Sequence, residues 1–381
     1  MTEQQKSASR DIPDPRNLSF KKPISAAVLL ITTLILIHHG LLQRLRIRSL
    51  KGAGYAKDQS YYLDLTYYVD RLHTQLPDVS DISPETITDR VNAINSLCPN
   101  PRQKFVMERL VTHLHQVVLE TNLTTEEWMT TVQFLTGVGQ ISTNTRQEFI
   151  LLSDVMGISA LVDSINHPRV GGSTENTVLG PFFTEDAADI PHGGSIASDK
   201  EKGIPMLVCG RILDTSGQPI PNAKIETWET DAEGLYDNQY ADRQGPDYRG
   251  RLRSQEDGSY AFRGIVPIAY PTPGDGPVGD LLKSLGRHGF RPAHLHMMIE
   301  APGFETLITA LFPRGDKYLK SDAVFGVKTS LIVDLEDVTS DEEARAKGFE
   351  SAPFKLLKQD FVLVGQEEAK KARAERAAKM V

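Results

Sequence analysis

The spacing of apolar residues changes near residue 200, and this change limits the folds open to the chain. From Tyr61 to Ile165, apolar residues recur every three or four positions, which is the period of an α-helix. Beyond it, short apolar stretches alternate with turn signals such as Asp214–Gly217 and Asp257–Gly258. Helices followed by many short strands predict an α+β protein, with an N-terminal helical domain followed by a mostly antiparallel β-sandwich.

Seven stretches after the change are predicted to be strands, because they are short, apolar and bounded by turn residues. They run over residues 206–213, 223–230, 260–265, 294–301, 306–312, 331–335 and 354–364. The helical part carries two start signals, a serine followed by proline at Ser83-Pro84 and a capping box at Thr124–Glu127.

Residues with metal-binding side chains gather in the stretch 264–300. This stretch ends in His294-Leu295-His296, within a predicted strand. Because side chains alternate across a strand, both imidazoles project from one face and Leu295 points into the opposite layer. Tyr270 in a proline-rich turn and Tyr236 further upstream add two phenols. Two anionic oxygens with two neutral nitrogens suit a hard ion such as Fe(III) better than Zn(II).

Composition excludes several classes of protein. The chain has 381 residues, 40% of them hydrophobic, which is long enough for two domains. A formal charge of −8 gives no basic surface for nucleic acid. The two cysteines, Cys98 and Cys209, are far apart and in no CxxC motif. No disulfide framework is therefore expected, and the body of the protein suits the reducing cytoplasm.

The N-terminal segment contains an uncharged apolar run from Ile24 to Ile37 that continues to Leu42. The run of 14 residues is short for a bilayer span, but the 19 residues of 24–42 are just long enough. The more basic flank follows the run, so an anchored protein would keep its remaining domains in the cytosol. A membrane anchor, a gene-model artefact and a disordered extension remain open as interpretations.

Two longer stretches resemble the intradiol ring-cleavage dioxygenases, which are non-haem Fe(III) enzymes that open catechols between the two hydroxyl-bearing carbons. These stretches are 210–236 and 285–296, and the resemblance extends over roughly residues 50–365. It implies a small aromatic diol or triol and O2 as substrates and no organic cofactor. It also implies a homodimer formed through the helical part, with a lipid along the dimer interface.

The resemblance assigns roles to five residues. Tyr236 and Tyr270 correspond to the equatorial and axial tyrosinates, and His294 and His296 to the imidazole ligands. The substrate would give up two protons, chelate the iron and displace Tyr270, while Arg291 stabilises charge on the ring. A non-catalytic β-sandwich binding module and a zinc hydrolase using the two histidines are the alternatives.

Three segments resemble hydroxyquinol 1,2-dioxygenases more than catechol enzymes: 148–157, 177–182 and 321–327. The implied ring pocket is lined by Leu151, Asp154, Val178, Leu179, Gly180, Pro181 and Val324. The Asp154 carboxylate would accept a hydrogen bond from the third hydroxyl of hydroxyquinol (benzene-1,2,4-triol) and disfavour substrates that lack it. The product would be a 3-hydroxy-cis,cis-muconate or its tautomer maleylacetate. Catechol cleavage to cis,cis-muconate is the alternative.

One position departs from the resemblance. Ala310 stands where hydroxyquinol enzymes are expected to have His and catechol enzymes Gln, so a polar contact to substrate or Arg291 is expected to be missing.

The chain is thus predicted to comprise four segments. These are an N-terminal extension (1–50), a helical dimerisation or linker domain (51–166), a β-sandwich catalytic domain (167–365) and a charged, exposed helical tail (366–381).

Overall fold

A computed structural model describes residues 82–143, 146–198, 203–243 and 245–379. The apolar segment 24–42 lies outside these ranges, so its predicted anchor is not addressed. Within the described ranges, no helix combines the length and apolar character that a bilayer span requires. The chain forms two compact units, Met1–Ile141 and Ser142–Val381. The second unit thus begins before residue 167, at which the predicted catalytic domain starts. The division of the chain into four segments stays a prediction.

The first unit contains helices α3 (Ile87–Asn95), α4 (Pro101–Thr121) and α5 (Thr125–Ile141). The capping box before α5 is confirmed: Glu127 N–H donates to Thr124 Oγ1 (3.2 Å) and Thr124 N–H donates to Glu127 Oε2 (2.9 Å). The start predicted at Ser83-Pro84 is wrong. The Ser83 carbonyl closes a turn with Thr86 N–H, and the helix begins only at Ile87.

Helices α4 and α5 expose large apolar side chains, among them Phe105, Leu119 and Trp128. Such side chains suit an interface. The homodimer and the bound lipid nevertheless stay predictions.

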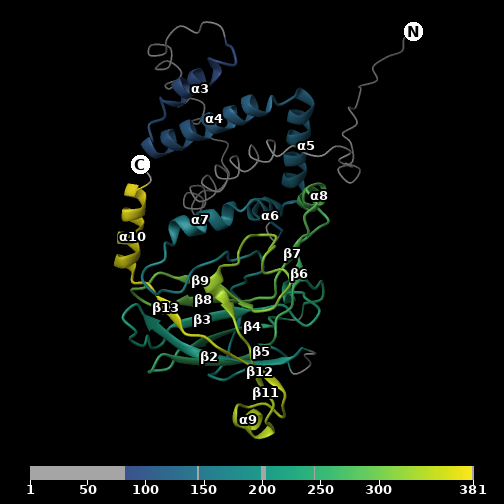
Figure 1. Cartoon of the computed structure of the whole chain (residues 1–381), viewed down its shortest axis with the longest axis vertical. Coiled ribbons are helices and arrows are strands. Elements are labelled where there is room, and N and C mark those ends of the chain that lie inside the picture. Colours follow the sequence, from purple (N-terminus) through teal and green to yellow (C-terminus); the bar gives the residue numbers. More distant parts are fainter. Residues whose placement is uncertain (1–81, 144–145, 199–202, 244, 380–381) are drawn as a thin grey trace, which may run out of the picture. The chain divides into compact units, whose positions relative to one another are not determined.

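The second unit is built on two β-sheets that form neighbouring layers (Figure 1). The six-stranded sheet has the order β1-β4-β3-β8-β9-β10, and its strands are Ala188–Asp189, Arg249–Arg253, Lys224–Trp228, Leu295–Glu300, Leu307–Pro313 and Ile332–Val333. The other sheet has the order β11-β12-β2-β13 with β5 also paired to β2, and its strands are Glu336–Val338, Phe354–Lys358, Pro205–Asp214, Phe361–Leu363 and Ser259–Ile265. Tyr270–Pro271 (β6) and Phe290–Arg291 (β7) form a separate antiparallel pair.

The predicted α+β architecture is confirmed, and all seven predicted strands have counterparts. Antiparallel pairing joins β4, β3, β8 and β9, and also joins β2 to β5. Parallel pairs occur where β1 meets β4, where β10 meets β9, and where β12 and β13 meet β2.

The predicted strand 354–364 is interrupted. Gln359 N–H donates to Cys209 O (2.9 Å), and the chain there passes so close to Gly210 of β2 that a Cβ would collide with the Gln359 carbonyl. A glycine in β2 therefore accommodates the crossing between β12 and β13.

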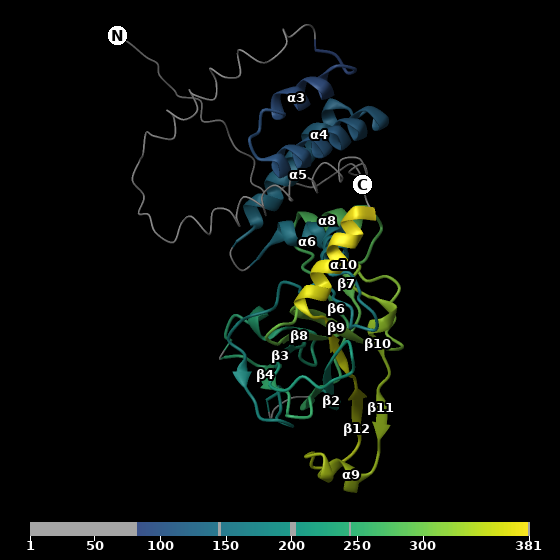
Figure 2. The ribbon, with the colours of Figure 1, turned by 90° about the vertical axis from the view of Figure 1, so that its left-hand side faces the viewer.

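Among its described residues, the unit also contains five α-helices: α6 (Glu148–Val155), α7 (Ile158–Asn166), α8 (Pro277–Ser284), α9 (Asp341–Ala346) and α10 (Gln366–Lys379). Strands β11 and β12 lie side by side and antiparallel: β11 runs toward α9, and β12 returns from it (Figure 2). The predicted C-terminal helix is present as α10, but it is not fully solvated. Arg373 pairs with Glu305 (3.0 Å), Arg376 Nη1 donates to Ser164 O (2.9 Å), and Ala369 is buried.

The hydrophobic core lies between the two sheets, and β8 shows how the sequence divides the two faces. Leu295, Met297 and Ile299 join core residues of β2 and β5, whereas Met298 packs with Trp228 on the other face. The predicted alternation is therefore confirmed for His294-Leu295-His296, although His294 lies one residue before β8 rather than within it.

Candidate metal and substrate site

The four predicted ligand side chains meet on the face of the six-stranded sheet that points away from the core. Tyr236 Oη lies 3.4 Å from Tyr270 Oη and 3.5 Å from His294 Nε2. His294 Nε2 lies 3.0 Å from His296 Nε2, and all four side chains are buried. Ligand atoms that share one metal at about 2.0–2.1 Å are separated by roughly 3–3.5 Å. The observed separations fit a shared cation.

Short local elements place these side chains. The pair β6–β7 puts Tyr270 directly opposite Arg291, three residues before His294. Tyr236 follows β3 at the start of a 3₁₀ turn (Asp237–Gln239), where its N–H donates to Gln239 Oε1 (2.8 Å). The proline-rich stretch before the two histidines thus folds back so that its tyrosine reaches them.

The protonation states of the imidazoles suit metal binding. Burial lowers the pKa of His294 and of His296 well below the usual value, so both rings are neutral. His294 Nδ1 donates to Pro292 O (2.7 Å), which leaves a lone pair on Nε2. That lone pair accepts from Arg291 Nη1 (3.1 Å) in the described structure. His296 Nδ1 is buried and has no hydrogen-bond partner among the described residues.

The phenol of Tyr236 requires a cation in order to ionise. Burial, followed by the neighbouring Tyr270, raises the pKa of Tyr236 well above its usual value. A strongly Lewis-acidic ion can take the place of such a proton. In the described part of the chain, no group of three or more His, Cys, Asp or Glu side chains could hold a metal. The two phenols are the side chains that lie beside the two imidazoles, and such a set suits Fe(III) better than Zn(II).

Aromatic rings hold two of the four ligand side chains in place. Trp228 stands opposite His296 on the neighbouring strand, with the rings stacked at 4.7 Å and an interplanar angle of 7°. Phe182 stacks on Tyr236 at 4.4 Å. Both rings fall in sequence segments singled out above, but only the fold reveals their contacts.

Arg291 is buried and paired with Asp322. Arg291 Nε donates to Asp322 Oδ1 (3.2 Å), and the two side chains are 4% and 3% exposed. Burial lowers the pKa of Arg291, but Asp322 and the tyrosines more than offset this, so its pKa is raised. Arg291 is therefore a permanent cation beside the ligand cluster. Asp322 was not among the predicted site residues, because its partner lies 31 positions away and neither residue's spacing signals the pair.

Asp154 lies buried near the end of α6, within electrostatic reach of Arg291 and Asp322. Burial raises the pKa of Asp154 to about 6, with a further rise from Asp322 and opposing effects from Ser159 and Arg291. A carboxyl group with this pKa is largely ionised at neutral pH, and it can accept a hydrogen bond from a substrate hydroxyl.

The other predicted pocket residues divide into two groups. Gly180 adopts a positive φ of 75°, and a Cβ there would lie 3.6 Å from His296 Cε1, so the chain passes directly over the imidazole. Leu179 packs with the Trp228–Tyr236–Tyr270 cluster, and Val324 N–H donates to Asp322 Oδ1 (3.2 Å). Leu151, Val178 and Pro181 are not placed against the four ligand side chains by any of the described contacts, and their role stays a prediction.

Ala310 is fully buried and stands opposite His296 on β9. It packs with Phe312 and Leu331. Ala310 thus places an apolar methyl group next to His296, and the loss of a polar contact to substrate or Arg291 stays a prediction.

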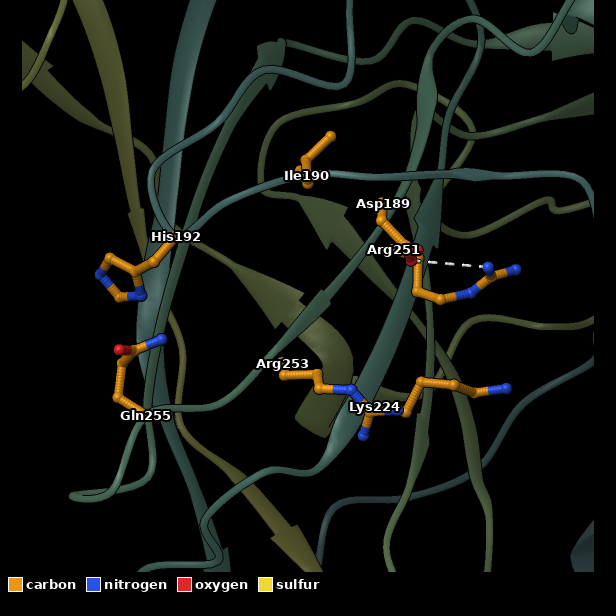
Figure 3. A pocket seen from close by; sticks show the side chains of 7 residues that line it. All are labelled: Asp189, Ile190, His192, Lys224, Arg251, Arg253 and Gln255. Carbon is orange, nitrogen blue, oxygen red and sulfur yellow. Dashed lines mark ion pairs between the residues drawn. The ribbon is translucent and has the colours of Figure 1, made fainter.

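A surface pocket of about 590 Å³ lies elsewhere and contains none of the predicted residues (Figure 3). It is lined by Asp189, Ile190, His192, Lys224, Arg251, Arg253 and Gln255. Lys224 is paired with Glu300 (2.7 Å) and Arg251 with Glu226 (2.7 Å). Its cations are largely committed to neighbouring carboxylates, so the chemistry points to the buried cluster instead.

Comparisons with known proteins agree with the geometry. Family models described as Dioxygenase and Catechol dioxygenase N terminus match residues 178–364 and 100–174. The chain is 51% identical over 306 residues to intradiol ring-cleavage dioxygenase hqdA of Aspergillus niger, covering 80% of this chain and 92% of that protein. It is 47% identical over 287 residues to hydroxyquinol 1,2-dioxygenase of Rhizobium sp., covering 75% and 95% of the two chains.

A solved structure, hydroxyquinol 1,2-dioxygenase from Pseudomonas putida, matches with a TM-score of 0.70 at 45% identity and covers 74% of this chain and 99% of that one. The binding-module alternative thus has no support from the relatives, which are named as dioxygenases. With relatives of this identity aligned over most of its length, the chain belongs to the intradiol ring-cleavage dioxygenase family.

Proposed function

We propose that the enzyme binds Fe(III) through Tyr236, Tyr270, His294 and His296 and cleaves hydroxyquinol with O2 between its two adjacent hydroxyl-bearing carbons. The observation that carries this proposal is the convergence of two buried phenols and two neutral imidazoles within 3.0–3.5 Å. When bound, iron would supply Lewis acidity and a template for the two substrate oxygens. Both oxygen atoms of O2 enter the ring-opened product.

The chain's own residues would handle protons and charge. Tyr270 Oη, in the tyrosinate form that a bound cation would maintain, is the proposed acceptor of a proton from the substrate; Tyr270 stands opposite Arg291 on the β6–β7 pair. The Arg291 guanidinium, held by Asp322, would stabilise negative charge that develops on the ring. Their burial keeps water away from these groups and strengthens the interaction.

Hydroxyquinol is favoured over catechol by two observations. Asp154 is a buried carboxyl near Arg291, available for a third substrate hydroxyl. In addition, two of the compared relatives are named hydroxyquinol 1,2-dioxygenases, at 45–47% identity. Catechol 1,2-dioxygenase activity is the competing proposal, and the comparison of the two substrates decides between them.

Iron removal tests the metal proposal. Purified protein is expected to bind about one iron per chain and to be wine-red through tyrosinate-to-Fe(III) charge transfer. Reduction and chelation should abolish colour and O2 uptake together, and Fe should restore both, whereas Zn should restore neither. Full activity in a colourless, zinc-loaded protein would contradict the proposal.

Replacing Asp154 by Ala tests substrate choice. The value of kcat/KM for hydroxyquinol is expected to fall about 10- to 100-fold, the equivalent of one hydrogen bond to a charged group. The value for catechol should change far less, because catechol has no third hydroxyl. The control is Asp163→Ala. Asp163 lies on α7, and its carboxylate pairs with His167 and with Lys328. Equal losses for both substrates in Asp154→Ala would argue against the specific contact.

The raised pKa of Asp154 also predicts a pH dependence. Activity toward hydroxyquinol should rise with pH through about 6, where the accepting carboxylate forms, and Asp154→Asn should remove this limb. The free energy of unfolding changes with pH in the opposite direction to this activity. Because the folded pKa lies above the unfolded value of 3.8, ionisation of Asp154 costs stability as pH rises from 3.8 to about 6. That cost is at most about 3 kcal/mol.

A further inference from the structure

Arg287 joins two segments that carry predicted substrate-pocket residues. Its Nη1 donates to Val155 O (2.8 Å), at the end of α6 and next to Asp154. Its Nη2 donates to Ala323 O (3.0 Å), next to Val324. One planar guanidinium therefore fixes the separation of two chain segments, at Val155 and Ala323, that lie 168 positions apart in sequence.

The aromatic ring of Phe325 completes this connection. The Arg287 guanidinium lies 5.0 Å from the centre of the Phe325 ring, a cation–π distance. In addition, a Cβ at Gly157 would lie 3.4 Å from Phe325 Cδ2, so the turn between α6 and α7 packs against the ring. Phe325 itself has a φ of 57°, an unfavourable conformation for a side chain of this size. The surrounding contacts hold it there.

Asp322 forms hydrogen bonds within the loop 322–326. Asp322 accepts hydrogen bonds from Val324 N–H (3.2 Å) and Gly326 N–H (2.9 Å) while it pairs with Arg291. A shift of α6 against this loop would therefore change the distance between Asp154 and the Arg291 side of the site.

No carboxylate pairs with Arg287 among the described residues, and it makes no described contact with the four proposed ligands. It also lines a surface cavity of about 410 Å³ with Lys320 and Phe325, so it lies on the solvent side of the site. Its hydrogen bonds all go to backbone carbonyls. The place of Arg287 in the fold is therefore not explained by an ion pair with a described carboxylate.

We propose that Arg287 is a positioning residue for substrate selection: it holds the end of α6 against the loop 322–326 and so sets where Asp154 and Val324 meet the substrate ring. The inference rests on the proposed function for the identity of the substrate. The hydrogen bonds by which Arg287 connects α6 to the loop 322–326 do not depend on the identity of the substrate.

The test compares Arg287→Gln with a matched control, Arg263→Gln. Arg263 on β5 also donates to two carbonyls, Gly193 O and Gly348 O, and lies 5.9 Å from the ring centre of Phe349. In Arg287→Gln, KM for hydroxyquinol should rise about tenfold with a smaller change in kcat, and the preference for hydroxyquinol over catechol should shrink. Arg263→Gln should leave the preference unchanged. Arg287→Lys should restore part of it, since an ammonium reaches one carbonyl.

A double-mutant cycle identifies the route of the effect. If Arg287 acts through Asp154, Arg287→Gln should cause little further loss of preference in an Asp154→Ala background. Full additivity of the two losses would overturn the proposal. An unchanged preference in Arg287→Gln would overturn it as well.

Hydrogen–deuterium exchange supplies a readout that needs no activity. Backbone amides of residues 153–157 and 322–326 should exchange at least about tenfold faster in Arg287→Gln than in wild type, and those in Arg263→Gln should not. Unchanged exchange in both segments would overturn the proposal. If wild-type enzyme cleaves catechol as well as hydroxyquinol, the proposed substrate fails, but the exchange result still decides the positioning role.

Discussion

Replacing Tyr236 by Phe is expected to weaken and shift the wine-red colour, because only the Tyr270 tyrosinate remains, and to lower kcat by more than about 100-fold, since even outer partners of metal ligands are worth 10- to 100-fold. The substitution removes only one oxygen atom from a fully buried ring that Phe182 continues to stack on. Loss of function would therefore report on the ligand atom and not on packing. Bound iron, the visible spectrum and O2 uptake are the measurements.

Two further variants separate ligand loss from the loss of any buried phenol. Tyr270→Phe should keep more activity than Tyr236→Phe, because Tyr270 is the proposed ligand that leaves when substrate binds. Tyr260→Phe removes another buried phenol, whose Oη donates to Gln359 O (2.8 Å) in the sandwich core. It should cost about 1 kcal/mol of stability and leave the colour intact. A Tyr236→Phe enzyme with the visible spectrum and kcat of wild type would contradict the proposed ligand set.

The sequence was informative wherever a local period determines the structure. Alternation alone predicts that the His294 and His296 rings share a face with Leu295 opposite, and the structure has this arrangement. Capping chemistry likewise predicts the start of α5. By contrast, β4 reads Arg-Gly-Arg-Leu-Arg, which has no strand pattern, and its pairing with β3 and β1 makes it a strand.

Contacts across long sequence separations could not be predicted in this way. Tyr270 reaches Arg291 through a pair of two-residue strands, too short to leave a periodic signal. Asp322 and Arg287 use their side chains to join loops, and nothing in their spacing indicates which distant carbonyl or guanidinium they meet. Resemblance to a known family placed Tyr236, Tyr270 and Arg291 in one site, where residue spacing alone left alternatives open.

Replacing Asp322 by Asn is expected to destabilise the protein strongly and to lower activity. Asp322 is the ion-pair partner of Arg291, and both side chains are almost completely buried. Breaking a buried pair leaves an uncompensated charge, which costs about 3–5 kcal/mol. The substitution keeps the shape of the side chain, but Val324 N–H and Gly326 N–H donate to different oxygens of Asp322, so Asn can accept from only one of them. The missing charge and one lost acceptor therefore act together. Thermal unfolding and kcat for hydroxyquinol are the measurements.

The matched control is Asp334→Asn, which breaks the Arg314–Asp334 pair (2.7 Å) on the surface. Both side chains there are more than 60% exposed, so solvent screens the pair and the melting temperature should hardly change. If the charge of Arg291 is the cause, Arg291→Met should relieve part of the instability of Asp322→Asn without restoring kcat, because Arg291 is itself proposed to act on the ring. A melting temperature for Asp322→Asn equal to that of Asp334→Asn would show that the buried Arg291–Asp322 pair contributes little to stability. Recovery of kcat in the double variant would show instead that Arg291 has no role in the chemistry.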